Sequence, residues 1–262
     1  MSTQHGDQTY IGSELELFAS ATNWKRYLKR HITPYLGSRV LEVGAGLGST
    51  TEMLCRGSEE KWVCLEPDRS LSDQIRHKVR TGELPGCCEV VEGTLTPGST
   101  LGVFDSILYV DVLEHIAEDR EEMERASSVL TQGGYLIVLS PAHQTLFTPF
   151  DRSIGHFRRY SRRTLGALST PDLENVLTRY LDSVGLLASL ANRFVLQSAM
   201  PSRGQIRIWN TLMVPLSRIL DPLLAYRLGK SVLIVWRKRV PKAFGRTYRA
   251  PGDSSRDLDL VR

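Results

Sequence analysis

The chain has 262 residues, of which 41% are hydrophobic and 24% charged, a composition typical of a folded protein and not of a disordered one. No run approaches the roughly 18 apolar residues of a membrane span, and the start, MSTQHGDQTY, lacks the features of a signal peptide, so we expect a cytoplasmic protein. The net charge of +4 hides an asymmetry, because residues 1–140 carry 13 basic and 21 acidic side chains whereas residues 141–262 carry 20 and 8. An arginine-rich second half suits nucleic acid, an anionic membrane surface or an acidic small molecule as a partner.

Segments typical of strands and helices alternate along the chain. The apolar spacing of residues 14–32 predicts one or two amphipathic helices in an N-terminal helical lead. Short apolar runs then predict five strands, at residues 39–44, 61–66, 88–93, 104–110 and 134–140, with stretches of helical composition between most of them. This alternation predicts an α/β fold, a Rossmann-like, mostly parallel and doubly wound sheet covered on both faces.

The second half predicts two more strands, at residues 175–183 and 231–239, which would complete a seven-stranded sheet. The segment between them reads as amphipathic helices, inserted as a cap over the ligand site or, alternatively, lying along a membrane surface. We therefore divide the chain into a lead (1–34), a core (35–184), a cap (185–228), a last core strand (229–240) and a flexible tail (241–262). The four cysteines have neither metal-ligand nor disulfide-framework spacing, so we expect reduced thiols and no metal ion.

A glycine-rich loop follows the first predicted strand, where doubly wound sheets bind their ligands. In VLEVGAGLGSTT, Gly44, Gly46 and Gly48 lead into a helix whose first N–H groups are free to bind a ligand. The G-x-G-x-G spacing differs from the G-x-G-x-x-G of dinucleotide sites. Glu66 ends the second predicted strand, 18 residues beyond Gly48, and a carboxylate there suits a ribose diol.

The segments VLEVGAGLGST, CLEPD, VVEGTL and FDSILYVDVLEHIAED resemble, in order, the motifs of class I S-adenosylmethionine-dependent methyltransferases, over roughly residues 35–165. The later part resembles a bacterial subgroup, with Pro141 and Ala142 after the fifth strand, a D-x-x-x-G-H-x-R-R-Y stretch from Asp151 to Tyr160, and G-K-S-V-L-I-V from Gly229 to Val235.

The resemblance implies S-adenosylmethionine as cofactor, S-adenosylhomocysteine as product, and a set of residues that bind them. These are Glu42, Gly44, Ala45 and Gly46 around the methionine part, Glu66 and Pro67 at the ribose, Gly93 and Thr94 at the adenine, and Asp111 and Val112 near the amino group and sulfonium. The family often has an acid beside the adenine, whereas here Glu92 precedes Gly93. Three of these assignments have a structural alternative. Glu42 could be a solvated strand residue, Gly93 and Thr94 could form a plain turn, and Asp111 could cap the helix that follows.

On the acceptor side we select His115 and His156 as candidate catalytic bases, since a hydroxyl acceptor benefits from a base of near-neutral pKa. A structural role is the alternative for each. His143, Arg158, Arg159 and Tyr160 are candidate substrate-binding residues. If the stretch DRSIGHFRRYSRR is helical, Arg158, Arg159, Arg162 and Arg163 form one stripe, either a solvated face or an anchor for an acceptor carboxylate or phosphate, with Asp151 orienting one arginine.

The sequence thus predicts a methyltransferase of small molecules, most simply a biosynthetic O-methyltransferase that acts on an acidic or hydroxylated metabolite. Nitrogen or carbon acceptors remain alternatives. An RNA or protein methyltransferase is less favoured, because we find no separate RNA-binding motif and expect no nucleic-acid partner. The glycine spacing disfavours an NAD-dependent oxidoreductase.

Overall fold

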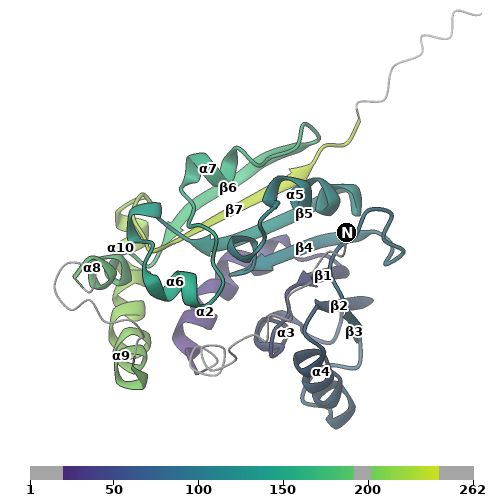
Figure 1. Ribbon diagram of the computed structural model, residues 1–262, viewed down its shortest axis with the longest axis horizontal. Helices are drawn as coiled ribbons and strands as arrows, with labels where there is room; N and C mark the ends of the chain where they lie inside the picture. The colour runs from purple at the N-terminus through teal and green to yellow at the C-terminus, as the bar shows by residue number, and fades with distance from the viewer. Residues whose placement is uncertain (1–19, 192–201, 242–262) are drawn as a thin grey trace, which may run out of the picture.

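The structure is a computed structural model that describes residues 20–191 and 202–241. Seven strands form one sheet in the order β3-β2-β1-β4-β5-β7-β6, in which all pairings are parallel except those of β7 (Figure 1). The strands are β1 (Arg39–Val43), β2 (Lys61–Glu66), β3 (Cys88–Glu92), β4 (Phe104–Val110), β5 (Leu130–Pro141), β6 (Leu173–Leu181) and β7 (Ser231–Lys238). The predicted mostly parallel, doubly wound sheet is confirmed.

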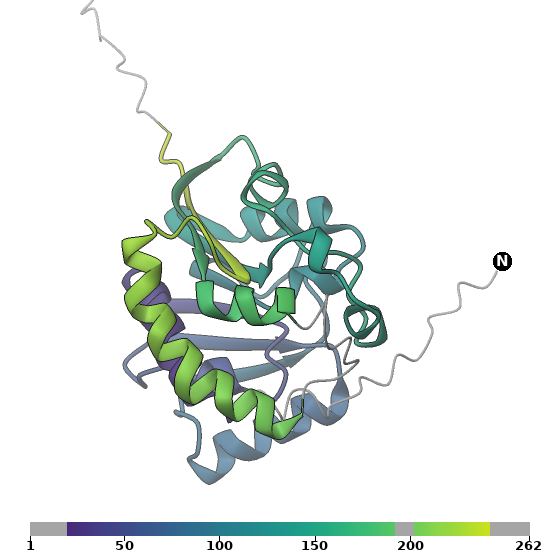
Figure 2. The same ribbon diagram turned by 90° about the vertical axis from the view of Figure 1, so that its left-hand side faces the viewer.

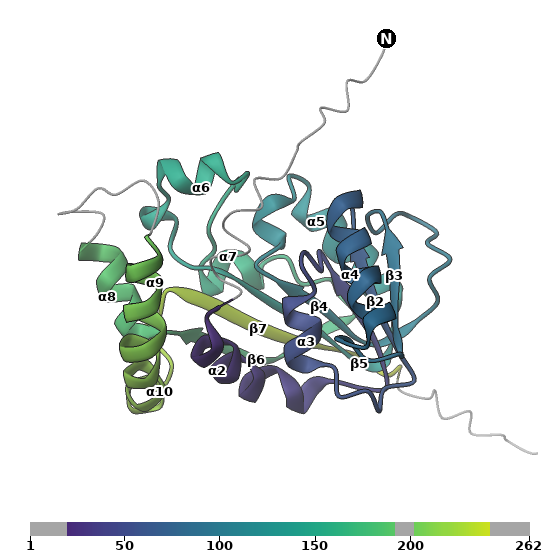
Figure 3. The same ribbon diagram turned by 90° about the horizontal axis from the view of Figure 1, so that it is seen from below.

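Helices cover both faces of this sheet (Figures 1 and 3). One apolar layer lies between the sheet and the helices α5 (Asp119–Ser128) and α7 (Arg162–Gly166). The opposite layer involves α2 (Thr22–Ile32), α3 (Ser49–Leu54), α4 (Arg69–Thr81) and the segment of α9 and α10 described below. Successive strand residues alternate between the layers: Leu41 and Val43 face the first, Val40 the second. A strand buried on both faces explains the continuous apolar runs in the sequence.

The predicted helical insertion between the sixth and seventh strands is confirmed (Figure 2). It contains α8 (Ser183–Ala191), α9 (Arg203–Ile208), a π-helical turn η5 (Trp209–Met213) and α10 (Val214–Leu223). The last three run on as one helical segment that packs beside α2. Of the described helices, none is long and apolar enough to cross a membrane.

Two buried carboxylates join the insertion to the rest of the fold. Asp221 in α10 accepts hydrogen bonds from the Tyr27 hydroxyl at 2.7 Å and from the amides of Asp182 and Ser183 at 2.7 and 3.0 Å. Asp182, directly after β6, accepts from Trp209 and Ser217 at 2.6 Å each. The network therefore links α2, the end of β6 and the insertion elements α8, η5 and α10.

Short helical turns connect the remaining elements: η1 (Thr33–Tyr35), η2 (Leu113–His115), η3 (Gln144–Leu146) and α6 (Pro149–Ser153). Two predictions fall partly or wholly outside the described residues, namely the helical content of 14–19 and the flexible tail beyond residue 241.

Candidate functional site

The loops after β1 and β4 meet where the chain reverses its direction of progress across the sheet, which is the ligand-binding position of doubly wound folds. Gly44 has a φ of 68°, and its amide donates to the Leu65 carbonyl at 2.8 Å. A Cβ on Gly44 would lie 2.7 Å from Cγ2 of Val112, so a larger residue would push the two loops apart. The candidate cofactor residues Gly44 and Val112 therefore lie against each other.

Glu66 ends β2 with its carboxylate turned toward the glycine loop. Its Oε2 accepts from the amide of Gly46 at 2.7 Å, and its Oε1 accepts from the amide of Asp68, just beyond Pro67, at 3.0 Å. Burial raises the pKa of Glu66, and these two amides act against that rise. Among the described residues each carboxylate oxygen accepts one hydrogen bond, which leaves a lone pair on each for a further donor.

Glu42 lies beneath α3, with its Oε2 held by two donors. The Thr51 hydroxyl donates to it at 2.6 Å and the Trp62 indole at 2.9 Å. Burial raises the pKa of Glu42 to about 7, opposed by these hydrogen bonds. The partner that an acid inside a strand requires is thus present within the protein.

The ends of β3 and β4 complete the cofactor side of this edge. Gly93 donates to the Glu66 carbonyl at 3.0 Å and has a φ of 142°, and a Cβ built on it meets no atom within 4 Å. Thr94 and Glu92 are exposed. Asp111 follows β4 with a φ of 55°, and its amide donates to the Leu139 carbonyl. The residue that precedes η2 is Val112 and not Asp111, and it makes no side-chain cap hydrogen bond.

These features fit the nucleoside cofactor implied by the sequence. The glycine loop exposes backbone N–H groups at the start of α3, the Glu66 carboxylate can accept from two hydroxyls, and space is open above Gly93. The residues that would hold the methionine, ribose and adenine parts come from the carboxyl ends of three neighbouring strands, β1, β2 and β3, with β4 next in the sheet.

The two histidines selected as candidate bases lie together. The ring centroids of His115 and His156 are 4.5 Å apart and the rings are nearly perpendicular. His156 Nδ1 lies 3.0 Å from Oδ1 of Asp151. Burial, followed by the neighbouring His156, lowers the pKa of His115 to about 4, which leaves this imidazole neutral near pH 7.

Asp151 also binds Arg159, as the sequence predicted for one of the arginines. Arg159 donates through Nε and Nη2 to the two carboxylate oxygens, at 2.8 and 2.9 Å. Burial would raise the pKa of Asp151, but the hydrogen bonds from His156 and Arg159 hold it well below its usual value. An ionised Asp151 therefore positions an arginine and a histidine together.

The predicted helical stripe of four arginines is wrong. Gly155, with a φ of 86°, follows α6, and the chain then runs without a helix to Tyr160, which forms a bridge with Ala142 at the end of β5. Arg158 instead pairs with Asp119 at 2.5 Å and donates to the Ala117 carbonyl at 2.8 Å. Tyr160 is buried, and its hydroxyl donates to Asp119 at 2.8 Å.

The edge also contains His143 and Lys230, the second of which was not selected from the sequence. His143 Nε2 lies 2.9 Å from the Gly229 carbonyl, and its ring packs on Tyr180. The Lys230 ammonium lies 3.8 Å from the centre of the Trp209 ring and 3.7 Å from Asp182. Burial lowers the pKa of Lys230, and Asp182 and Asp111 oppose that shift. The position of Lys230 in the G-K-S-V-L-I-V stretch is the sequence feature that could have identified it as a candidate site residue.

Glu114 is a second residue that sequence reasoning missed, although it stands beside His115. Its side chain is fully buried in η2, and within residues 20–191 and 202–241 neither of its carboxylate oxygens has a hydrogen-bond donor. The neighbouring Ser140 hydroxyl lowers its pKa, yet Ser140 Oγ itself makes no hydrogen bond. Burial, followed by the charge of Asp111, raises the pKa of Glu114 well above its usual range.

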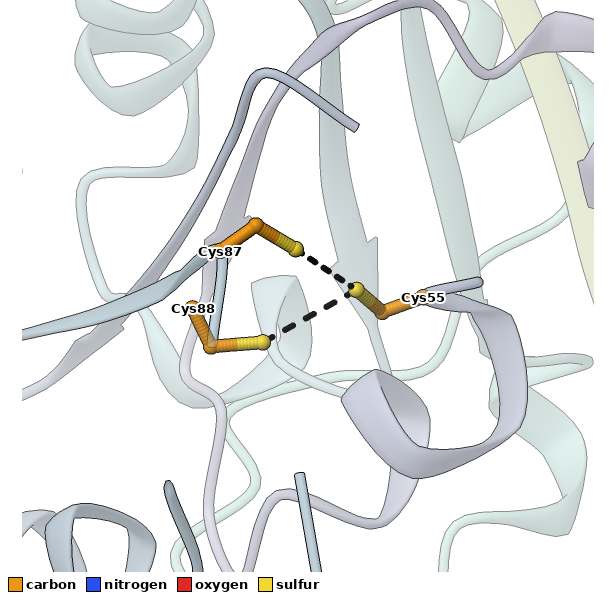
Figure 4. Close-up of side chains that lie close together, drawn as sticks. All are labelled: Cys55, Cys87 and Cys88. Carbon is orange, nitrogen blue, oxygen red and sulfur yellow. Dashed lines mark hydrogen bonds between the residues drawn. The ribbon is translucent and has the colours of Figure 1, made fainter. Parts of the chain in front are cut away.

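Three cysteines gather at the opposite edge of the sheet (Figure 4). The sulfur of Cys55, after α3, lies 3.6 Å from that of Cys87 and 3.8 Å from that of Cys88, at the start of β3. All four cysteines are free thiols, as expected.

Comparison with known proteins matches residues 41–136 to a family described as "Methyltransferase domain". A "Ubiquinone biosynthesis O-methyltransferase" from Caulobacter sp. (strain K31) is 28% identical over 107 residues, which cover 40% of this chain and 42% of that protein. The chain thus spans about two fifths of the length of the curated relative that it matches.

Solved structures share the fold at low sequence identity. Coclaurine N-methyltransferase, solved with N-methylheliamine and SAH, is 15% identical with a TM-score of 0.58, covering 83% of this chain and 72% of that one. The [4+2]-cyclase SpnF is 13% identical with a TM-score of 0.57, covering 88% and 95%. Because one of these neighbours, SpnF, is a cyclase, the fold by itself does not fix the reaction.

Proposed function

Residues 41–136 form a methyltransferase domain of the class I, S-adenosylmethionine-dependent type, and from this premise we propose that the chain methylates an oxygen of a small, acidic or hydroxylated molecule. The observation that carries the proposal is the Glu66 carboxylate, fixed at the end of β2 by the amides of Gly46 and Asp68. That carboxylate suits a ribose diol, and the spacing of the glycines beside it disfavours a dinucleotide.

We assign the donor side to the carboxyl ends of β1 to β4. Glu66 and Pro67 would hold the ribose, and Gly93 and Thr94 would border the adenine. Gly44, Ala45 and Gly46 would lie around the methionine part, above Glu42, while Asp111 and Val112 would lie near its amino group and sulfonium. The close packing of Gly44 on Val112 supports this arrangement, because it keeps the two loops in a fixed relation.

S-adenosylmethionine, when bound, would supply an electrophilic methyl group to the acceptor oxygen, with sulfur keeping the electrons of the broken carbon–sulfur bond and the hydroxyl proton passing to a nearby base or to solvent. The protein contributes chiefly by holding the acceptor in line and by excluding water. His115 and His156 are assigned to the acceptor hydroxyl, and their adjacency supports that role.

An anionic acceptor is favoured by the cations at this edge. Arg159 uses two of its five N–H groups for Asp151, which leaves donors for an acceptor carboxylate or phosphate. Arg158, His143 and Lys230 add further positive or polar groups near the same strand ends, whereas Tyr160, whose hydroxyl is bound to Asp119, would support the loop. We assign the insertion to a cap, since Trp209 reaches from it to Lys230.

Calorimetry with S-adenosylmethionine, S-adenosylhomocysteine and NAD tests the class of protein. Both adenosyl compounds should bind and NAD should not. Glu66→Gln should weaken S-adenosylhomocysteine by about 10- to 100-fold, since replacing an ionised acceptor of two hydroxyls costs about 1.5–3 kcal/mol. Glu60→Gln, at an exposed residue just before the amino end of β2, is the control and should bind normally. Binding of NAD alone would refute the proposal.

A further inference from the structure

The strongest unexplained feature of the fold is the Glu114 carboxyl group. A fully buried carboxyl normally has hydrogen-bond donors, because removing it from water without them costs several kcal/mol. In the described part of the chain both oxygens of Glu114 are without one. Its surroundings are nevertheless polar, with the His156 Nε2 atom 3.8 Å from its Oε1. The carboxyl group therefore has room for a partner at this point.

His156 is oriented as metal-binding histidines are. Oδ1 of Asp151, in a carboxylate that also accepts from Arg159, lies 3.0 Å from Nδ1 of His156, so this nitrogen is the one placed to donate. The lone pair of the imidazole is then on Nε2, on the side of Glu114. A carboxylate that binds the far nitrogen of a ligating histidine is a common supporting contact at metal sites, where it fixes the tautomer and the direction of the ring.

His115 supplies a third ligand atom. One nitrogen of His115, one of His156 and one oxygen of Glu114 all lie within 4.8 Å of one another. The backbone holds the two segments together, since the amide of Phe157 donates to the Glu114 carbonyl at 2.8 Å. Bonds of about 2.0–2.2 Å from nitrogen and oxygen to a metal ion place neighbouring ligands roughly 3–3.5 Å apart. Small side-chain movements would bring these three atoms to that spacing.

We propose that Glu114, His115 and His156 bind a divalent transition-metal ion, of the class that includes Zn²⁺, Fe²⁺ and Mn²⁺. Two imidazoles and one carboxylate fill three coordination positions of such an ion and leave the others open. The sequence predicted no metal ion because the ligands come from two separate segments, Glu114 and His115 in η2 and His156 after α6. Their spacing in the chain follows no familiar metal motif.

The role of the ion rests on the proposed function, whereas its binding does not. With their nitrogens on the ion, His115 and His156 would act on the acceptor hydroxyl through the metal and not as bases. A hydroxyl at an open position would lose its proton to solvent more readily, because a bound cation lowers the pKa of a coordinated oxygen. The resulting oxygen is the nucleophile for the methyl carbon. The ion would also give an acidic acceptor a second point of attachment.

Cobalt(II) is a direct probe of this site. We would treat the full-length, untagged protein with a chelator and titrate it with CoCl₂, following heat and visible absorption. One ion should bind per chain with bands of nitrogen and oxygen coordination, and azide should shift these bands by taking an open position. Glu114→Gln and His156→Gln should weaken binding by at least about 10-fold, and Asp151→Asn, which acts through His156, by about 10- to 100-fold.

Two controls keep the result interpretable. Glu118→Gln and His77→Gln change exposed residues of the same types and should bind Co²⁺ as the unaltered chain does. Thermal unfolding checks the fold of each variant. Glu114→Gln is expected to fold because no described residue donates a hydrogen bond to the Glu114 carboxylate and the substitution keeps its backbone contact with Phe157. No binding, equal binding by all variants, unshifted bands with azide, or a sulfur charge-transfer band that Cys55→Ser abolishes would each overturn the proposal. S-adenosylhomocysteine binding is measured in parallel, so that loss of the metal site and failure of the proposed function are distinguished.

Discussion

Single residues at the carboxyl edge of the sheet differ mainly in the partners of their acidic groups. Glu66 accepts from two backbone amides, Glu42 from two side chains, and Glu114 from no donor among the described residues. The sequence alone selected Glu66, because an acid at the end of the second strand has a definite chemical use. It passed over Glu114, since whether a carboxyl group lacks donors depends on what the fold places around it.

The arginines of the DRSIGHFRRYSRR stretch illustrate the same limit. The pairing of Asp151 with an arginine was predicted correctly from charge alone, and the structure identifies Arg159 as the partner. The helix was predicted wrongly, because Gly155 adopts a positive φ and Tyr160 joins the end of β5, a contact between segments that no local pattern reveals.

The two neighbouring arginines should differ in their contribution to stability. Arg159→Ala removes two hydrogen bonds from the buried Asp151 and should lower the free energy of unfolding by about 2 kcal/mol. Arg158→Ala removes a more exposed ion pair, worth about 1 kcal/mol or less. Urea denaturation at neutral pH measures both. Equal losses would show that the Asp151 pairing is not the stronger contact.

At the scale of elements, the sequence predicted the strands and the helical insertion well, because apolar runs and helical periodicity are local signals. The amphipathic pattern predicts that the apolar side chains of the insertion lie on a buried side of its helices. The structure buries only some of them. Val214 and Trp209 are buried against the sheet, but Ile208, Leu212, Ile219 and Leu223 are more than half exposed. Periodicity identifies an apolar face without stating which other surface covers it.

The two faces of α10 should respond differently to substitution. Val214→Ala leaves a cavity in the core and should cost about 2 kcal/mol. Ile219→Ala removes a side chain that is 63% exposed and should change the free energy of unfolding by less than about 0.5 kcal/mol. Urea denaturation measures both variants. If the dependence of the unfolding free energy on urea concentration is the same for both, the difference between their midpoints gives the difference in stability. A large loss for Ile219→Ala would mean that another surface covers this face in solution.

The whole molecule combines an acidic first half, which forms five of the seven strands, with a basic second half that supplies β6, β7 and the helical insertion between them. The charge asymmetry is visible in the sequence, but the sequence does not show how many of the basic side chains pair with groups inside the protein. Several of the basic side chains bind partners within the protein. Arg158 and Arg159 form ion pairs with aspartates, and Arg179 in β6 donates a hydrogen bond to His31 in α2. The net charge of a segment therefore overstates the charge that a ligand encounters.

The contact between Arg179 and His31 has a consequence for acid stability. His31 is buried, its Nδ1 accepts from Nη1 of Arg179 at 2.8 Å, and its ring packs between Tyr27 and Tyr226. Burial first, and then the charges of Arg179 and Arg30, lower the pKa of His31 to about 4. An unfolded histidine titrates near 6.5. Between these two pH values the unfolded chain binds a proton at His31 that the native chain does not bind.

The free energy of unfolding should therefore be insensitive to His31 above about pH 6.5 and should fall as the pH is lowered toward 4, by up to about 3 kcal/mol from this residue. Other groups titrate in the same range, so the measurement is a difference: urea denaturation at several pH values for the unaltered chain and for His31→Asn, whose amide oxygen can still accept from Arg179. The variant starts less stable because the ring packing is lost, but its stability should decline less steeply in acid. His77→Gln, at an exposed site of α4, should follow the unaltered chain. Parallel curves for His31→Asn and the unaltered chain would mean that His31 titrates normally and that the arginine contact does not disfavour its protonation.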